Sequence, residues 1–235
     1  MKFAIISAGE GSRLLQEGVQ LPKPLVQLNG VAMIDRLIHL FARQGADEVL
    51  VIINNEVPLT KAHLAELERH AEVPLRVIVK TTPSSMHSFY ELSPYLKDDR
   101  FCLTTVDTVF REDEFARFIE AFKHSDKDGM MAVTDYIDDE KPLYIGTDEN
   151  LDITGFYDTA MPDTKYISGG IYCLTPKAIR TLERCMRAGM SRMRNFQRQL
   201  VNDGLRLEAY PFSKILDVDH AEDIVKAERF LKGGD

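Results

Sequence analysis

The chain has 235 residues, of which 44% are hydrophobic and 28% are charged, and its formal net charge is −8. This length suits a single α/β domain, spanning 1–235, with a substantial core, and so ordinary a composition argues against disorder. The acidic balance argues against nonspecific nucleic-acid binding, and no apolar run has the length of a membrane span or the pattern of a signal peptide, so we expect a cytoplasmic protein with neither nucleic-acid nor membrane partners.

The first predicted element is a buried strand, because residues 3–6 form an apolar run. A loop with glycines at 9 and 11 follows, and glycine lets backbone N–H groups approach a phosphate closely. Arg13 adds a forked donor and Lys23 a compact positive charge. Prolines on both sides of Lys23 stiffen the backbone that carries it. The stretch is therefore predicted to bind a polyanion.

Two common phosphate motifs are absent from this stretch. Leu14 stands where the dinucleotide fingerprint needs a third glycine, and the G-x-x-x-x-G-K-S/T loop does not occur. The chain instead carries three motifs in this order: Ala8-Gly9-x-Gly11-Ser12-Arg13-Leu14, Pro22-Lys23-Pro24-Leu25-Val26 and Gly30-x-x-Met33-Ile34. Together they resemble the opening of the sugar-1-phosphate nucleotidylyltransferases.

This resemblance implies a Rossmann-like three-layer α/β/α fold with a mixed, mostly parallel sheet, similar to the glycosyltransferase-A fold. It also implies roles for the opening stretch. Arg13 would hold the β and γ phosphates of a nucleoside triphosphate, and Lys23 would sit nearer the α-phosphate and the acceptor, so these two are the expected catalytic residues. Glu10 departs from the family, which often has a small residue there. The expected nucleotide-binding residues of this stretch are Ala8, Gly9, Gly11 and Ser12.

Farther along the chain, strand-like and helical runs alternate, which is typical of a mostly parallel sheet covered on both faces. Helices are predicted over 31–44, 61–71 and 112–124, from Pro176, and over 220–231. Strands are predicted over 48–53, 75–80, 101–106, 130–136, 143–145, 153–157, 167–174, 205–210 and 214–218. The three cysteines lack C-x-x-C spacing, so neither a disulfide framework nor a zinc site is indicated.

Carboxylates follow two of these strands. Asp107 ends the 101–106 run, at the sheet edge where ligands of such folds bind. It matches the family's Mg²⁺-binding aspartate, and either Asp217 or Asp219 matches the second acid of the family, with Asp219 narrowly favoured. One or two carboxylates plus phosphates and water commonly hold this ion, so Mg²⁺ is the expected cofactor. In the alternative interpretation, Asp219 caps the last helix with Glu222 as its capping-box partner.

Two further segments resemble substrate-binding loops of the family. Ser84 and Ser85 stand where the family contacts the nucleobase, although an ordinary serine-rich turn explains them equally well. For the acceptor, Asp158 can replace a family glutamate, but Thr159 cannot replace the lysine that follows it. Lys165 is the candidate substitute for that lysine. The expected acceptor-binding residues are Gly146, Asp158, Lys165 and Ser168.

The resemblance implies an enzyme that transfers a nucleoside monophosphate from a nucleoside triphosphate to a sugar 1-phosphate and releases pyrophosphate. Since the acceptor phosphate is already anionic, the reaction needs positioning and charge neutralisation rather than a protein nucleophile. The missing lysine leaves open a cytidylyltransferase acting on phosphocholine or another non-sugar phosphate. Glu10, Val106 and Thr159 leave open a non-catalytic nucleotide-sugar sensor or regulatory subunit. The arginines between 180 and 198 form a solvated helical face or a contact between copies, so a homo-oligomer also stays open.

Overall fold

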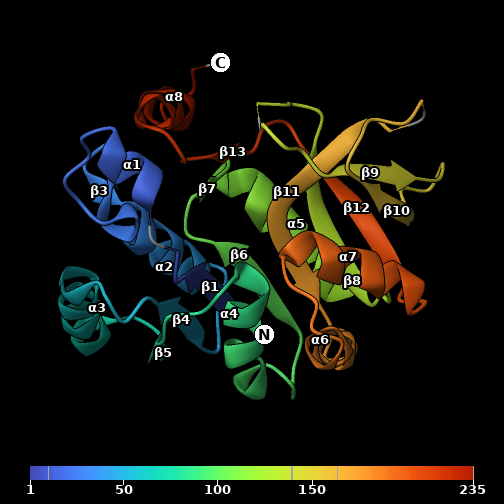
Figure 1. Ribbon diagram of the computed structural model, residues 1–235, viewed down its shortest axis with the longest axis horizontal. Helices are drawn as coiled ribbons and strands as arrows, with labels where there is room; N and C mark the ends of the chain where they lie inside the picture. Colours follow the sequence, from blue (N-terminus) through green and yellow to red (C-terminus); the bar gives the residue numbers. More distant parts are fainter. Residues whose placement is uncertain (10, 139, 163, 235) are drawn as a thin grey trace.

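The central element of the structure is a mixed β-sheet (Figure 1). The computed structural model describes residues 1–9, 11–138, 140–162 and 164–234. Within them, four parallel strands form one half of the sheet, in the order β6 (Phe101–Thr105), β1 (Lys2–Ser7), β4 (Val49–Ile53) and β5 (Leu75–Val79). The other half adds β11 (Tyr166–Leu174), antiparallel to β6, and then β9 (Tyr144–Thr147), β10 (Ile153–Tyr157), β8 (Gly129–Thr134) and β12 (Leu207–Phe212).

Helices cover both faces of this sheet, as the alternating pattern of the sequence predicts. On one face lie α2 (Met33–Arg43), α3 (Pro58–His70), α5 (Glu112–His124) and α8 (Ala221–Leu231), and on the other lie α4 (Ser85–Leu92), α6 (Lys177–Arg187) and α7 (Met193–Asn202). Side chains of β1 alternate between the two layers, with Phe3 and Ile5 in one core and Ala4 and Ile6 in the other. The three-layer α/β/α fold is thus confirmed.

Short elements account for most differences from the predicted pattern. The predicted helix over 31–44 starts only at Met33, because β3 (Val31–Ala32) pairs with β2 (Gln27–Leu28). The helix α1 (Ser12–Gln16) is a single turn, too short to show a helical period. The predicted strand over 214–218 shrinks to β13 (Leu216–Asp217), which pairs with β7 (Thr108–Val109).

The helix α7 was not predicted as a separate element, although its buried positions have helical spacing. Met193, Phe196, Gln197 and Leu200 are buried at positions i, i+3, i+4 and i+7. One member of this stripe is a glutamine, and arginines lie between the others. Because of these polar side chains, the sequence of this segment does not show apolar residues repeating at helical spacing.

The parallel strands all end at the same edge of the sheet, so the residues that follow these strands lie close together there. Ser7 ends β1, Asn54 follows β4, and Asp107 follows β6 by two residues. The C-terminal segment joins the same edge, since the N–H of Val218 donates to the carbonyl of Asp107 at 3.1 Å. Pairing of β13 with β7 therefore carries Asp219, far away in sequence, to the end of β6.

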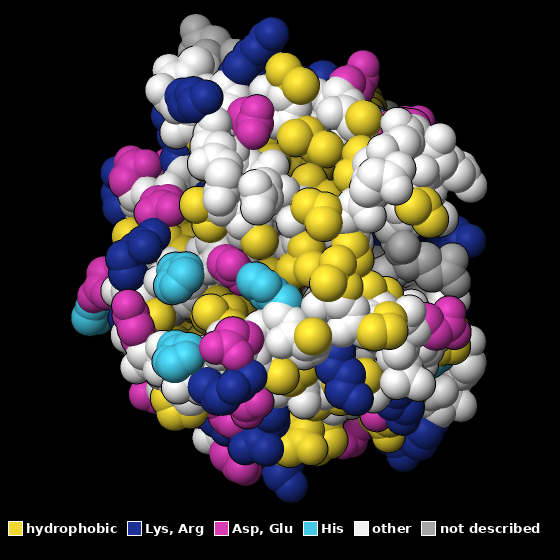
Figure 2. Space-filling view, turned by 90° about the vertical axis from the view of Figure 1, so that its left-hand side faces the viewer, with side chains coloured by type: hydrophobic (Ala, Val, Ile, Leu, Met, Phe, Trp, Pro, Cys, Tyr) yellow, Lys and Arg dark blue, Asp and Glu magenta, His cyan; other side chains and the backbone are white. Residues whose placement is uncertain are grey.

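The face on the left of Figure 1, where α3 lies, carries histidine side chains among acidic and basic ones (Figure 2). Two of the histidines on α3 are paired with carboxylates, His63 with Asp35 at 2.7 Å and His70 with Glu66 at 3.2 Å. Among the described helices, none is long and apolar enough to cross a membrane.

Candidate active site

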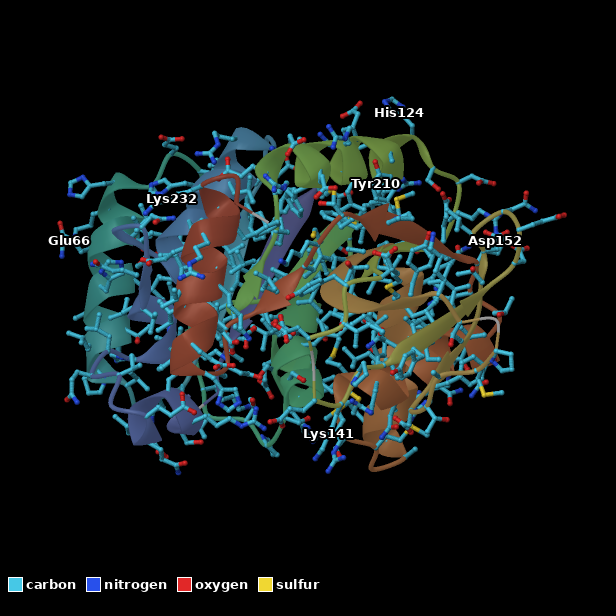
Figure 3. All side chains as sticks on the ribbon, turned by 90° about the horizontal axis from the view of Figure 1, so that it is seen from above. Glu66, His124, Lys141, Asp152, Tyr210 and Lys232 are labelled. Carbon is cyan, nitrogen blue, oxygen red and sulfur yellow. The ribbon has the colours of Figure 1, made fainter. Side chains whose placement is uncertain are left out.

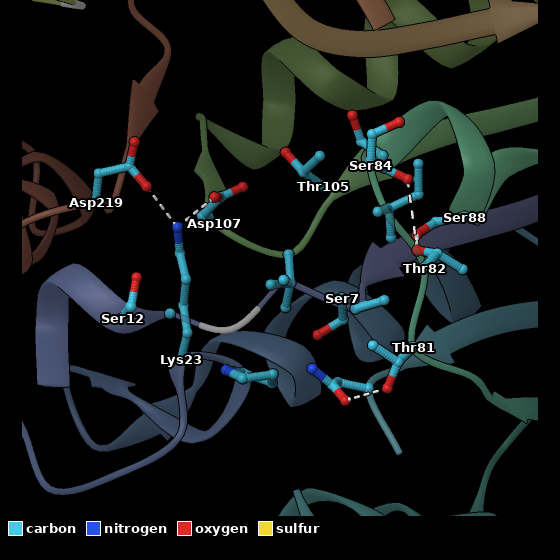
Figure 4. A pocket seen from close by; sticks show the side chains of 18 of the residues that line it. Ser7, Ser12, Lys23, Thr81, Thr82, Ser84, Ser88, Thr105, Asp107 and Asp219 are labelled. Carbon is cyan, nitrogen blue, oxygen red and sulfur yellow. Dashed lines mark hydrogen bonds and ion pairs between the residues drawn. The ribbon is translucent and has the colours of Figure 1, made fainter. Parts of the chain in front are cut away.

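A pocket of about 460 Å³ opens at the edge where the parallel strands end. Its walls come from the loop after β1, the Lys23 segment, the residues after β4, β5 and β6, and Asp219. Figure 4 shows two different ends: Lys23, Asp107 and Asp219 gather at one, and Thr81, Thr82, Ser84 and Ser88 lie at the other. The pocket therefore has a charged end and a neutral end rich in hydroxyl groups.

At the charged end, one ammonium group joins two carboxylates. Lys23 Nζ donates to Asp107 Oδ2 at 2.5 Å and to Asp219 Oδ1 at 2.6 Å (Figure 4). Burial alone lowers the pKa of Lys23, but the charges of Asp107 and Asp219 outweigh it and raise that pKa to about 12. Arg13 Nη1 lies 3.4 Å from Asp219 Oδ2. The structure thus brings together the two expected catalytic residues and two of the three expected metal ligands.

Local backbone geometry fixes the direction of Lys23. The residue begins a 3₁₀ turn (Lys23–Leu25), and Pro24 in this turn is buried. Gly11 packs directly beneath it in the left-handed region, with φ +62°, and a Cβ on Gly11 would lie 2.9 Å from the Cβ of Lys23. Only glycine satisfies both conditions. Gly9 also lines the pocket, and a Cβ there would meet no other atom within 4 Å.

We expect Gly11→Ala to lower the free energy of unfolding by about 2–3 kcal/mol, because the left-handed backbone costs about 1–2 kcal/mol and the clash with Lys23 adds to it. Urea denaturation measures this change. Gly18→Ala is the matched control, since Gly18 also has a left-handed φ of +90° but open space around a new Cβ. Equal losses in the two variants would show that Gly11 does not press against Lys23.

The carboxylates at the charged end suit a hard cation that also binds phosphates. Asp107 Oδ1 is buried and has no hydrogen-bond partner among the described residues, so one of its oxygens is available to a ligand. In the described part of the chain, no group of three or more His, Cys, Asp or Glu side chains could hold a metal by itself. Two carboxylates fit Mg²⁺ that takes its other ligands from water and substrate phosphates.

Asp217, the other candidate ligand, lies elsewhere. Its side chain is exposed and lines the neighbouring pocket rather than the one that holds Asp107. Asp217 lies within β13, whereas Asp219 lies two residues beyond the end of this strand, where its Oδ1 accepts from Lys23 Nζ. The structure brings only Asp219 together with Asp107.

The predicted nucleotide-binding residues line the same pocket. Ala8, Gly9, Gly11, Ser12, Ser84 and Ser85 all border it. Ser84 precedes α4 and its Oγ lies 2.8 Å from Nδ1 of His87, while Ser85 is the first residue of the helix. Glu10, the departure in the glycine loop, lies outside the described residues.

A second pocket, of about 760 Å³, adjoins the first and shares Arg13 and Asp219 with it. Ser168 lines this second pocket and donates to Gln197 Oε1 at 3.0 Å. Basic side chains also border it. They are Lys141, Arg194 and Lys226. Figure 3 shows Lys141 on the side of the molecule where the orange helices α6 and α7 lie.

The other three predicted acceptor residues lie outside this second pocket. Gly146 packs against β10, where a Cβ would lie 2.9 Å from Thr154 Oγ1. Asp158 pairs with Arg198 at 2.7 Å and with Arg194 at 2.6 Å, and these hydrogen bonds hold its pKa below the usual range. Lys165 is exposed, with its ammonium 5.0 Å from the ring centre of Tyr166.

Comparison with known proteins decides the family. Residues 3–202 match the MobA-like NTP transferase domain. The chain belongs to this family. It is similar to mannose-1-phosphate guanyltransferases from Neurospora crassa, with 25% identity over 57% of this chain and 37% of the relative, and from Schizosaccharomyces pombe, with 25% identity over 78% of this chain and 52% of the relative. The chain thus spans about half or less of the length of these relatives.

Solved structures of this NTP transferase fold overlay nearly the whole chain. The inositol-1-phosphate CTP transferase from T. maritima superposes with a TM-score of 0.80 at 16% identity, covering 100% of this chain and 97% of that chain. A protein assigned as a glucose-1-phosphate thymidylyltransferase from Bacillus anthracis, in complex with a sucrose, superposes with a TM-score of 0.84 at 16% identity. The superposition covers 100% of this chain and 96% of that chain. These likenesses confirm the fold.

The sequence pointed to only some of the residues that line the two pockets. Asn54 lines the first pocket and Arg194 the second, and neither was predicted. Asn54 directly follows the buried apolar strand β4, and Asp107 follows β6 by two residues. The rule that ligands bind at the carboxyl ends of such strands predicted Asp107 and could have predicted Asn54 as well. Arg194 had no such signal, because it lies in a run of arginines on helices.

Proposed function

We propose that the protein is a cytoplasmic nucleotidyltransferase that transfers a nucleoside monophosphate from a nucleoside triphosphate to a sugar 1-phosphate or a similar small phosphate, releasing pyrophosphate. The observation that carries this proposal is the position of Arg13 and Asp219 at the border of two pockets, with Lys23 and Asp107 beside them. Two anionic substrates that react at their phosphates need such a shared charged border. Family membership supports the same chemistry.

In this proposal the nucleotide occupies the first pocket and the acceptor the second. An oxygen of the acceptor phosphate attacks the α-phosphorus, and the bond from that phosphorus to the oxygen of the leaving pyrophosphate breaks. Arg13 holds the β and γ phosphates. Lys23 turns from its two carboxylates toward the α-phosphate and neutralises charge that develops there. No side chain needs to act as a nucleophile.

Asp107 and Asp219 are proposed to hold Mg²⁺, and the available Oδ1 of Asp107 supports this role. When bound, the ion neutralises phosphate charge. Both carboxylates now contact Lys23 Nζ, so the lysine and the ion would compete for the same two carboxylates. Binding of nucleotide phosphates removes this conflict, because the phosphates attract the lysine and also supply further oxygen ligands for the metal.

Arg194 is proposed to anchor the acceptor in the second pocket. It lies on α7 between Asp158 and the carbonyl of Lys141, to which Nη2 donates at 2.9 Å. We expect Arg194→Gln to raise the KM for the acceptor about 10- to 100-fold, the effect of losing one charge-assisted hydrogen bond, and to leave the KM for the nucleoside triphosphate unchanged. Steady-state kinetics with each substrate varied in turn measure both.

Arg180→Gln is the matched control, because Arg180 is exposed on α6 and borders neither pocket. It should leave both KM values as in the wild type. An unchanged acceptor KM in Arg194→Gln would place the acceptor elsewhere.

The proposal is tested by measuring pyrophosphate release with Mg²⁺ from each nucleoside triphosphate against a panel of acceptors. The similar proteins suggest mannose 1-phosphate, glucose 1-phosphate and inositol 1-phosphate, and the departure at Thr159 adds phosphocholine. We expect one nucleotide and one sugar phosphate to give a clear signal. A signal with phosphocholine alone would favour a cytidylyltransferase for non-sugar phosphates. Nucleotide-sugar binding without release from any pair would indicate a non-catalytic sensor.

A further inference from the structure

The short helix α1, which carries Arg13, has few contacts that hold it in place. It spans five residues, and only Leu14 among them is buried. At its start, Gly11 packs directly beneath Lys23. At its end, the backbone N–H of Glu17 donates to the carbonyl of Arg13 at 3.0 Å, so Glu17 continues the turn that carries Arg13. Whatever binds the side chain of Glu17 therefore also fixes this turn.

The carboxylate of Glu17 binds the start of α8, which lies beside α1 (Figure 1). Glu17 Oε2 accepts from the backbone N–H of Ala221 at 2.6 Å, and Glu17 Oε1 lies 2.6 Å from Nδ1 of His220. A carboxylate can only accept, so Nδ1 of His220 carries the hydrogen. Both oxygens of Glu17 are thus hydrogen-bonded to a segment that is far away in the sequence.

The start of α8 is held in place without Glu17. The backbone N–H groups of Asp219 and His220 both donate to Asp223 Oδ2, at 3.2 and 2.8 Å. Just before them, β13 pairs with β7. The contact between α1 and α8 therefore joins a weakly anchored element to a firmly anchored one. Breaking this contact should release α1 and leave Asp219 where it is.

We propose that Glu17 is a positioning residue, which holds α1 in the orientation where Arg13 reaches the β and γ phosphates of the nucleotide. This inference rests on the proposed function. The side chain of Arg13 is 54% exposed, and its Nη1 lies as far as 3.4 Å from Asp219 Oδ2. Such an exposed ion pair fixes an arginine only weakly. The direction of Arg13 therefore depends on the turn that carries it, and hence on Glu17.

The charge of Glu17 and its contacts with α8 have opposite effects on nucleotide binding. A carboxylate near the phosphates repels them, so loss of the charge alone would tighten binding. Loss of the contacts leaves Arg13 correctly placed in only a fraction of the molecules, which weakens binding in proportion. We expect Glu17→Ala to raise the dissociation constant of the preferred nucleotide, among ATP, GTP, CTP and UTP with Mg²⁺, about tenfold by titration calorimetry. The kcat at saturating substrates should fall much less.

Two control variants separate the charge from the contacts. In Glu17→Gln the amide oxygen can accept from Ala221, and the amide nitrogen can donate to Nδ1 of neutral His220. This variant loses the charge and keeps the contacts, so it should bind the nucleotide at least as tightly as the wild type. Glu183→Ala removes the same charge from the exposed surface of α6, which borders neither pocket there, and should leave the dissociation constant unchanged.

A double-mutant cycle shows whether Glu17 acts through Arg13. Arg13→Ala should raise the dissociation constant of the nucleotide about 10- to 100-fold, because charge-assisted hydrogen bonds to the phosphates are lost. Adding Glu17→Ala to this variant should weaken binding no further, since the side chain that Glu17 positions is gone. The affinity of the nucleotide-free protein for Mn²⁺ should be the same in Glu17→Ala as in the wild type, because Asp219 stays in place.

Four results would overturn the inference while the proposed function stands. They are unchanged or tighter nucleotide binding in Glu17→Ala, equally weak binding in Glu17→Ala and Glu17→Gln, the same loss with and without Arg13, or a rise in the KM for the acceptor instead of the nucleotide. A wild type that binds none of the four nucleotides contradicts the proposed function itself. The wild-type titration therefore separates the two failures.

Discussion

Replacing Lys23 by alanine is expected to lower kcat for pyrophosphate release about 10²- to 10³-fold, the loss found when one preorganised charge donor is removed from a site of developing charge. Lys23 is suited to this role because its side chain is only 13% exposed and its backbone is held between Pro22 and Pro24. Its raised pKa keeps the charge present throughout the working pH range. The KM for the nucleotide should change much less than kcat, since Arg13 and the loop amides still hold the β and γ phosphates.

The same variant makes a second, independent prediction. Without Lys23, the carboxylates of Asp107 and Asp219 lose their shared cation, so we expect Mn²⁺, used as a probe for Mg²⁺, to bind the nucleotide-free protein more tightly than it binds the wild type. Lys61→Ala on the exposed surface of α3 is the control and should change neither kcat nor the affinity for Mn²⁺. An unchanged kcat in Lys23→Ala would remove Lys23 from catalysis.

Asp107→Asn is expected to lower kcat about 10³-fold, because a metal that neutralises phosphate charge contributes several kcal/mol to the stability of the transition state. Asparagine retains the shape and can still accept a hydrogen bond from Lys23. Most of the loss should therefore come from the weaker metal site and should be partly recovered at high Mg²⁺ concentration. Kinetics over a range of Mg²⁺ concentrations measure this recovery.

Two parallel variants decide which C-terminal aspartate acts with Asp107. Asp219→Asn should behave like Asp107→Asn, since both carboxylates contact Lys23 Nζ. Asp217→Asn should change kcat less than about threefold, because an exposed side chain outside the first pocket contributes little to charge at the α-phosphorus. The opposite order of effects would assign the metal to Asp217.

The parts of the site that could be predicted from the sequence are those set by local rules. Gly11 and Lys23 belong to a short motif in which glycine geometry and proline stiffness act within a few residues of each other. Asp107 follows an apolar strand, and the sheet edge then fixes its place. The fold followed from the same kind of signal, because strongly periodic runs such as the helix over 112–124 form as expected.

The contacts of the expected acceptor-binding residues could not be predicted in this way, because they depend on distant segments of the chain. Asp158 has a suitable charge, but it forms ion pairs with Arg194 and Arg198 on α7. These pairs could not be foreseen, because α7 was not predicted as a separate helix. Lys165 was proposed from its position in a loop, and the structure places it against Tyr166. The choice between Asp217 and Asp219 likewise depended on the pairing of β13 with β7.

Transfer of the nucleoside monophosphate itself is tested most directly by following a labelled α-phosphate. The protein is incubated with Mg²⁺, an acceptor phosphate and the preferred nucleoside triphosphate labelled at the α-phosphorus or, separately, at the γ-phosphorus. We predict that the α label appears in a product joined to the acceptor, that the γ label appears in pyrophosphate, and that Lys23→Ala slows both equally. A γ label found on the acceptor, or an α label that stays in free nucleotide, would contradict nucleotidyl transfer.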